Sequence, residues 1–353
     1  MELLDLPIEL LALLPKFFHD IEDFTNASSS CRILRNACEM ALPNAILRLA
    51  AVSSRVFFRP DPHFLIAATA RQVSDWALLK PENTETLRQA FRGGIDTLFE
   101  LCIAKAGLTM EDIRCLHASR FSTINPVADM IDKCAGAQWY ATPDFWGGGV
   151  SDAQTIGFDP PKSLLQIVIY GELFCTTMLA AISPAASLPR FDLDTRLDFV
   201  KYCIPDPMCW SAYKGLTVSN IGPYASGDHS TIFEIEDDQV RLNHILNCRT
   251  WREAWEKVRL QVGSDFETEW KQQMWEAAVQ LTGLNGLELL RPMEVKVRRE
   301  RLVGTYKSIQ RLGVKDRPAR YKFGTREHVA YGFPSMADEV RVTVSGYWGP
   351  WDE

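Results

Sequence analysis

The sequence predicts a mainly α-helical fold. Apolar residues recur three and four positions apart along most of its 353 residues, and helix-starting Thr–acid or Ser–acid pairs recur as well. One short segment, 340–348, alternates like a β-strand. We therefore expect an N-terminal helical unit over 1–45, joined to a predominantly α-helical body over 46–353 that carries a few short strands.

The N-terminal unit is expected to contain two helices. The first begins at Leu6 and Pro7, because Pro is favoured in the first turn of a helix, and its apolar residues continue to Phe18. Pro15 lies inside this run and predicts a kink. Acids between residues 20 and 23 form an elbow before the second helix. The apolar stripe of that helix comprises Phe24, Ala27, Cys31, Leu34 and Cys38. One face cannot bury so many large apolar groups, so part of them would stay exposed unless a partner covers them.

The body shows further helices in order. Residues 61–79 have helical spacing, and the segment 81–113 is predicted as helices broken at Gly93-Gly94 and ended at Gly107. Three pairs predict helix starts, namely Thr109 with Asp112, Thr250 with Glu253, and Ser264 with Glu267. The helices expected after the last two pairs carry tryptophans on one face, and core packing is the favoured interpretation. These are Trp251, Trp255, Trp270 and Trp275.

The apolar stretch 164–186 is the candidate for a membrane span. It has the required length, but Gln166 and Glu172 interrupt it, so we favour a buried core helix and predict no membrane partner. The N-terminus begins with Glu2 and Asp5, which is unlike a signal peptide. The nine cysteines are dispersed and odd in number, which is typical of reduced thiols in a cytoplasmic or nuclear protein.

Known catalytic motifs are missing from the sequence, so we predict no catalytic residue, no cofactor and no metal. The pair Asp237-Asp238 could chelate a hard cation, but a solvated pair is the favoured interpretation. A long loop rich in glycine and aromatic residues is a possible ligand loop. Its candidate residues are Trp139, Tyr140, Asp144, Phe145 and Trp146, and Asp152 and Asp159 follow it.

A basic run occupies residues 296–322, with ten Lys or Arg and two acids. It could contact phosphate or an acidic partner, but a helix with a basic solvent-exposed face explains it more simply. The whole chain has a net charge of -7, which argues against a broad basic surface. We therefore predict no nucleic-acid partner.

The first forty residues resemble the F-box, whose pattern is roughly L-P-x-E-L-L, a helix, an elbow, then V-C-R and a second helix. The chain as a whole looks most like F-box-like proteins of filamentous fungi, because the stretches 48–72 and 138–149 are similar to sequences that follow the box in them. The residues that match the box are Leu6, Pro7, Glu9, Leu10 and Leu11, then Asp23 and Phe24, then Ser30, Cys31, Arg32, Leu34 and Arg35.

The resemblance implies a substrate receptor of an SCF-type ubiquitin ligase, in which the box docks on the adaptor subunit and the body recruits an unknown protein target. Such a protein carries no bond chemistry of its own. The docking residues that the resemblance implies are Leu6, Pro7, Leu10, Leu11, Leu14, Phe18 and Phe24. Two alternatives stay open: an α-helical enzyme or small-ligand-binding protein whose N-terminal helices are only core, and a structural protein. Exposure of Leu10, Leu11 and Phe18 favours the receptor, and burial of all three by residues beyond 60 favours the alternatives.

Overall fold

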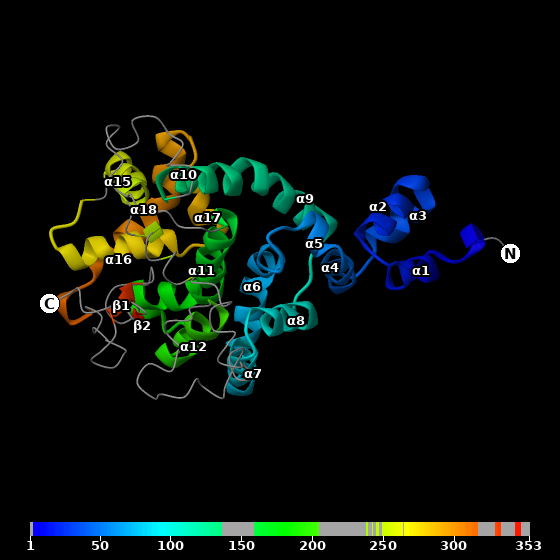
Figure 1. Cartoon of the computed structure of the whole chain (residues 1–353), viewed down its shortest axis with the longest axis horizontal. Helices are drawn as coiled ribbons and strands as arrows, with labels where there is room; N and C mark the ends of the chain where they lie inside the picture. The colour runs from blue at the N-terminus through cyan, green and yellow to red at the C-terminus, as the bar shows by residue number, and fades with distance from the viewer. Residues whose placement is uncertain are drawn as a thin grey trace, which may run out of the picture.

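The computed structural model describes residues 3–135, 159–204, 249–263 and 265–316, a few isolated positions between 238 and 246, and the backbone of 329–332 and 343–346. The described chain is mainly helical, which confirms the predicted fold class. A small N-terminal unit lies at one end and a larger helical body at the other, with α4 between them (Figure 1).

The helices of the N-terminal half run from the unit into the body. Their bounds are η1 Leu3–Asp5, α1 Ile8–Leu11, η2 Leu14–Phe17, α2 Ile21–Ser30, α3 Arg32–Glu39, α4 Pro43–Val52, α5 Ser54–Phe57, α6 His63–Ala77, α7 Pro81–Arg92, α8 Ile95–Lys105, α9 Met110–Ser119, η3 Arg120–Ile124 and α10 Asn125–Ala135. The breaks at Gly93-Gly94 and Gly107 are where the sequence predicted them. Gly94 has φ 86°, a backbone conformation that favours glycine.

The helices of the C-terminal half complete the body. Their bounds are α11 Pro160–Ile182, η5 Pro184–Ala186, α12 Leu193–Cys203, α15 Arg249–Val262, α16 Glu269–Gln280, α17 Leu284–Leu287, η8 Glu288–Leu290, α18 Val295–Arg311 and η9 Val314–Asp316. Two short segments, β1 Val329–Gly332 and β2 Thr343–Gly346, pair antiparallel with Val329 opposite Gly346. The described part of residues 3–316 contains no strand, so the expected strands are not supported as a component of the body.

Helix α11 forms the centre of the body, as the sequence predicted for this apolar stretch (Figure 1). It is long and apolar enough to cross a membrane, but 83% of its most apolar window is buried inside the structure. It packs against α6, where the Ser74 hydroxyl donates to the Leu173 carbonyl at 2.5 Å. Aromatic rings also pack between α11 and α12: the rings of Tyr170 and Phe174 on α11 lie 4.8 Å apart, and Phe199 of α12 lies 6.0 Å from Phe174. The apolar residues of α11 therefore form part of the hydrophobic core of the body.

Local signals explain several helix boundaries. Thr109 caps α9 with the two bonds of a capping box. Its hydroxyl accepts from the Asp112 amide at 3.1 Å, and its own amide donates to the Asp112 carboxylate at 2.8 Å. Segment η3 is π-helical and ends directly before α10, where Pro126 lacks the N–H that would continue the α-helical pattern.

The other two predicted helix starts are wrong. Helix α15 already includes Arg249, so Thr250 lies inside it, and α16 begins at Glu269 after Thr268 rather than near Ser264. The tryptophan prediction is confirmed for the side chains of Trp251, Trp255 and Trp275, which are fully buried.

Candidate partner-binding site

The first helical run of the N-terminal unit is divided in two. Pro7 is the N-cap residue of α1, and its carbonyl accepts from the amides of Leu10 and Leu11 at 3.0 and 3.1 Å. The helix ends at Leu11, and η2 then carries Pro15 near its start. A proline ring clashes with the carbonyl four residues earlier, which here is Leu11. The expected kinked helix is therefore replaced by two short ones.

The acidic elbow is a helix start. The Asp20 carboxylate accepts from the amides of Glu22 and Asp23, both at 2.9 Å, and the Asp23 carboxylate accepts from the His19 amide at 3.0 Å. The predicted second helix is also two helices, because Cys31 between α2 and α3 is extended, with φ −155° and ψ 164°. Acids in the first turn of α2 stabilise its positive end.

The interior of the unit contains two of the residues named for docking. Leu11 is 1% exposed and lies on α1, which contacts α3, where Ala37 is fully buried. Phe24 is also buried, and its ring meets that of Phe18 edge-on with 6.3 Å between centroids. Phe18 is half-buried. In the isolated chain, Leu11 and Phe24 therefore stabilise the unit and are not available at its surface.

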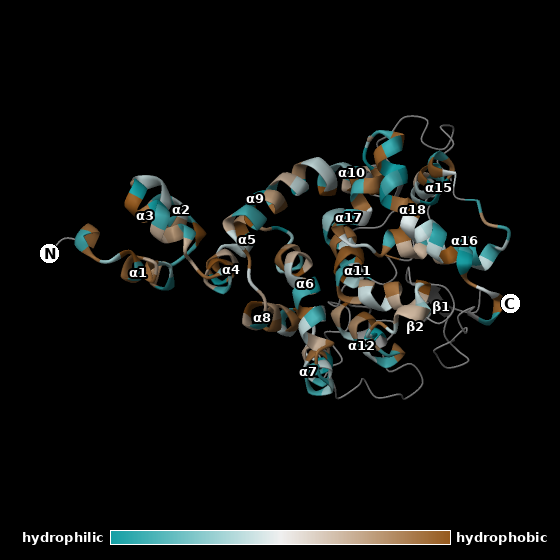
Figure 2. Ribbon diagram, turned by 180° about the vertical axis from the view of Figure 1, so that it is seen from behind, coloured by the Kyte–Doolittle hydropathy of each residue, from teal (hydrophilic) through white to brown (hydrophobic). Residues whose placement is uncertain are grey.

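A group of apolar side chains remains exposed on the same unit. Leu10 is 50% exposed and Phe17 is 78% exposed. We call the group the tip surface, and its members are Leu3, Leu4, Ile8, Leu10, Leu13 and Phe17. The backbone stays helical or turn-like from Ile8 to Phe17, so the spacing of Leu10, Leu13 and Phe17 favours one common side. Pro7 is exposed nearby. Hydropathy colouring shows apolar stretches on α1 and on the short helix before it (Figure 2).

The remaining docking candidates, Leu6 and Leu14, are half-buried. The docking candidates that the resemblance implies therefore include both surface and interior residues of the unit, and their role in partner binding stays a prediction. Leu13 and Phe17 are also exposed, although they were not among the docking candidates. Their signal was available in the apolar run itself, because a short amphipathic segment cannot bury residues on both of its faces.

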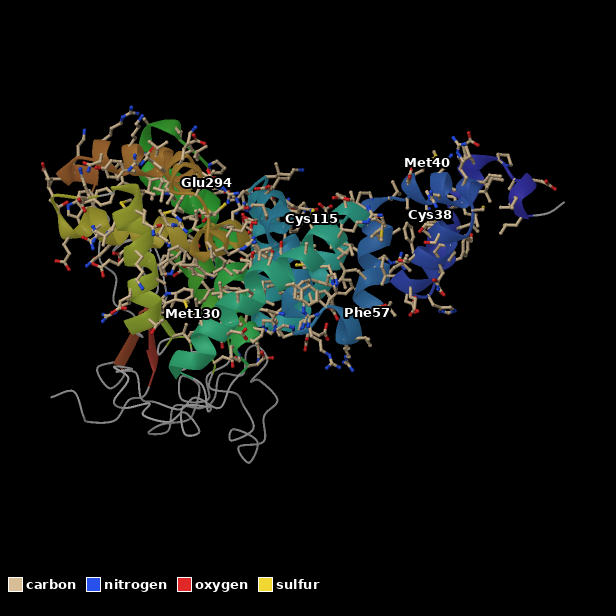
Figure 3. All side chains as sticks on the ribbon, turned by 90° about the horizontal axis from the view of Figure 1, so that it is seen from above. Cys38, Met40, Phe57, Cys115, Met130 and Glu294 are labelled. Carbon is tan, nitrogen blue, oxygen red and sulfur yellow. The ribbon has the colours of Figure 1, made fainter. Side chains whose placement is uncertain are left out.

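Helix α4 holds the unit away from the body. It contacts α2 and η2 on one side and α8 on the other. The Pro43 carbonyl at its start accepts from the Leu108 amide at 3.0 Å, and the Gln72 side chain bonds both the amide and the carbonyl of Gly107. Labelled Met40 lies on the unit and Phe57 lies beyond α4, nearer the body (Figure 3). The tip surface is therefore at one end of the molecule.

The other predicted sites have separate outcomes. The possible ligand loop, with Trp139, Tyr140, Asp144, Phe145 and Trp146, lies outside the described residues, as do Asp152 and Asp237. The expectation of a solvated acid pair is wrong for Asp238. This residue is buried, and its carboxylate accepts from Lys162 Nζ at 3.1 Å and from Gln166 Nε2 at 2.6 Å. Asp159 caps α11. Within the described ranges, no three His, Cys, Asp or Glu side chains could jointly hold a metal ion.

The basic run includes helix α18, and its residues differ in exposure. Lys296, Arg299 and Lys307 are exposed, as expected for a solvent-facing basic surface. Arg298 is only 6% exposed, and burial lowers the pKa of its guanidinium. It lines a pocket of about 400 Å³ between α10, α15, η8 and the start of α18. Sequence reasoning missed this pocket, because its walls come from segments far apart in the chain.

Comparisons with protein-family models, with curated proteins and with solved structures give no match for this chain.

Proposed function

We propose that this chain is a substrate-receptor subunit of an SCF-type ubiquitin ligase that docks on the adaptor subunit through the tip surface. The single observation that carries the proposal is the exposure of Leu10 and Phe17 on a unit held away from the body. Large exposed apolar groups on a soluble chain commonly mark protein–protein contacts. The same segment carries the F-box-like residues Leu6, Pro7, Glu9 and Leu10.

Of the three residues expected to separate the alternatives, Leu10 is exposed, Phe18 is half-buried and Leu11 is buried, so Leu10 is the one that supports the receptor. Leu10 is exposed, and Leu11 is buried in the unit itself, where α1 contacts α3. Leu11 also stands outside the large hydrophobic cluster, which extends from the body into the unit, where it includes Phe24. A helix kept only for core packing would direct its large apolar residues into that cluster.

The remaining parts of the proposal follow from the receptor role. The body recruits a protein target, and the chain has no bond chemistry of its own. The F-box-like helices are joined to this body, which carries a few short strands near the C-terminus. A cytoplasmic or nuclear location agrees with the free cysteines among the described residues, four of which are buried. These four are Cys38, Cys102, Cys175 and Cys203.

Calorimetric titration of the full chain with a recombinant fungal SCF adaptor tests the proposal. We expect saturable one-to-one binding, weakened when Phe17→Ala shortens the most exposed side chain of the tip surface. Leu79→Ala is the matched control, because Leu79 is 74% exposed but lies on the body between α6 and α7. The proposal is wrong if the wild-type chain shows no affinity for the adaptor at high micromolar concentration.

A further inference from the structure

A second site lies at the opposite end of the molecule from the tip surface. The pocket of about 400 Å³ named above lies where α15 and η8 meet the start of α18, with α10 beside them. This volume is within the usual range for small-molecule sites, roughly 300–1,000 Å³. Met130 and Glu294 mark two of the adjoining elements (Figure 3). Much of the lining is apolar, namely Met130, Ala254, Val258, Leu289, Leu290, Pro292, Met293 and Val295.

A buried cation lines this pocket without a matching anion. The guanidinium of Arg298 donates to the Gln261 side chain and, at 2.8 Å, to the Arg291 carbonyl, and both acceptors are neutral. Its Nε is buried and has no hydrogen-bond partner, and Arg298 forms no ion pair with any residue that the structure describes. Burying a charge without a counter-charge is unfavourable, so the site is suited to an anion supplied from outside the chain.

The start of α18 adds a second attraction for an anion. Its N-cap residue Glu294 makes no side-chain capping bond, and the first turn of this helix contains no acid. Unsatisfied amides and the positive end of a helix favour a negative group. Two more cations line the pocket, Lys257 and Arg291, against one acid, Glu253. The buried guanidinium of Arg298, the start of α18 and the volume of the pocket together favour the binding of one anionic group.

We propose that this pocket binds a small organic anion, with a carboxylate or phosphate group on Arg298 and the start of α18 and an apolar body against α15 and η8. A guanidinium binds such a group through its N–H donors, and each Nη of Arg298 has a second hydrogen besides the one it donates to Gln261 or to the Arg291 carbonyl. Lys257 is exposed at the pocket and adds a further positive charge. This inference does not depend on adaptor binding.

Calorimetric titration of the full chain with octanoate and with phenyl phosphate tests the proposal, and octanamide and benzyl alcohol serve as uncharged analogues. We expect at least one of the two anions to bind one-to-one at micromolar to millimolar concentration, and the uncharged analogues to bind much more weakly. The anion that binds more tightly identifies the head group. Inorganic phosphate should bind more weakly than phenyl phosphate, because it lacks the apolar body.

Three variants locate the binding. Arg298→Gln should weaken anion binding by about tenfold or more, since a charge-assisted pair is lost. Lys257→Gln should weaken it by about threefold to fivefold, because this charge is exposed to solvent. Arg299→Gln is the control: it removes the same charge from the neighbouring position of α18, outside the pocket lining, and should leave binding unchanged.

The inference is overturned if neither anion binds at millimolar concentration, or if the uncharged analogues bind as tightly as the anions. It is also overturned if Arg298→Gln and Lys257→Gln bind the anions as the wild-type chain does. Circular dichroism shows whether Arg298→Gln is folded. If it is not, Lys257→Gln decides the question, and unchanged affinity in that variant contradicts the proposal.

Discussion

Replacing Leu10 by Ala and, separately, Leu11 by Ala should have opposite consequences, although the two residues are adjacent. Leu10 is 50% exposed and Leu11 is 1% exposed. Complete burial of a Leu side chain contributes about 1.5–3 kcal/mol. About half of Leu10 is still available for burial by a partner, so Leu10→Ala should remove about 1 kcal/mol of adaptor binding. That loss corresponds to about a fivefold weaker affinity.

Leu11→Ala should act on folding instead. Removing a buried Leu side chain typically costs about 2–5 kcal/mol, because the lost burial adds to the cavity left behind. Leu11 lies outside the main core, so the loss should be local to the N-terminal unit. Hydrogen exchange of α2 and α3 amides should become faster by about a factor of ten or more, since 1.4 kcal/mol is tenfold. The exchange of α11 amides in the body should not change.

For both variants, calorimetry measures the affinity for the adaptor, and site-resolved hydrogen exchange measures the local stability of the N-terminal unit. Leu10→Ala should leave the exchange of α2 and α3 within about threefold of the wild type, because surface changes usually stay within about 0.5 kcal/mol. Leu79→Ala on the body should alter neither quantity. If Leu10→Ala accelerates exchange in the unit as strongly as Leu11→Ala does, Leu10 is a core residue and the assignment of the tip surface is wrong.

Three further predictions concern the body. Gly171→Ala should lower stability by about 1–3 kcal/mol in denaturant titrations, because the added Cβ would lie 2.9 Å from a backbone nitrogen in the turn before α17. In the control Gly304→Ala, the added Cβ meets nothing within 4 Å, so this change should stabilise α18 by about 0.5–1 kcal/mol. If both variants lost the same stability, the close packing around Gly171 would be contradicted. Burial raises the pKa of Cys102 and of Tyr170 to about 12, from 9.0 and 10.0, so stability should be complete below pH 9 and fall as the pH rises towards 12. Denaturant midpoints that stay constant from pH 8 to about 11 would contradict this burial. Exposed Cys115 should be alkylated in the native chain long before Cys102, as read by peptide mass spectrometry, and equal rates would refute their assigned exposures.

Much of the helical body could be predicted from the sequence, because its signals are local. Gly93-Gly94 separates α7 from α8, and Thr109 with Asp112 caps α9, since both depend on backbone geometry within a few residues. Glu172 inside α11 was evidence against a membrane span. The Glu172 carboxylate forms an ion pair with the guanidinium of Arg71 on α6 at 2.8 Å, and the sequence could not identify this partner.

The errors arose where one local signal competed with another or with packing. Pro15 ended α1 instead of kinking it, and Thr250 resembled a cap but lies inside α15. Leu10 and Leu11 look equivalent in the sequence, and only the contact between α1 and α3 distinguishes them. In the sequence, Arg298 looked like one member of a basic surface. Its burial could not be foreseen, because α15 and η8 cover it only in the folded chain. Sequence patterns therefore located the segments, and tertiary contacts assigned individual residues their roles.

The central claim is that the N-terminal unit, and not the body, contacts the adaptor. Hydrogen exchange of the full chain with and without a saturating fungal SCF adaptor measures this directly. We expect slower exchange in residues 3–17 when the adaptor is present, with the amides of α11 and α18 unchanged. Protection confined to the body, or no protection anywhere in the chain, would contradict the account.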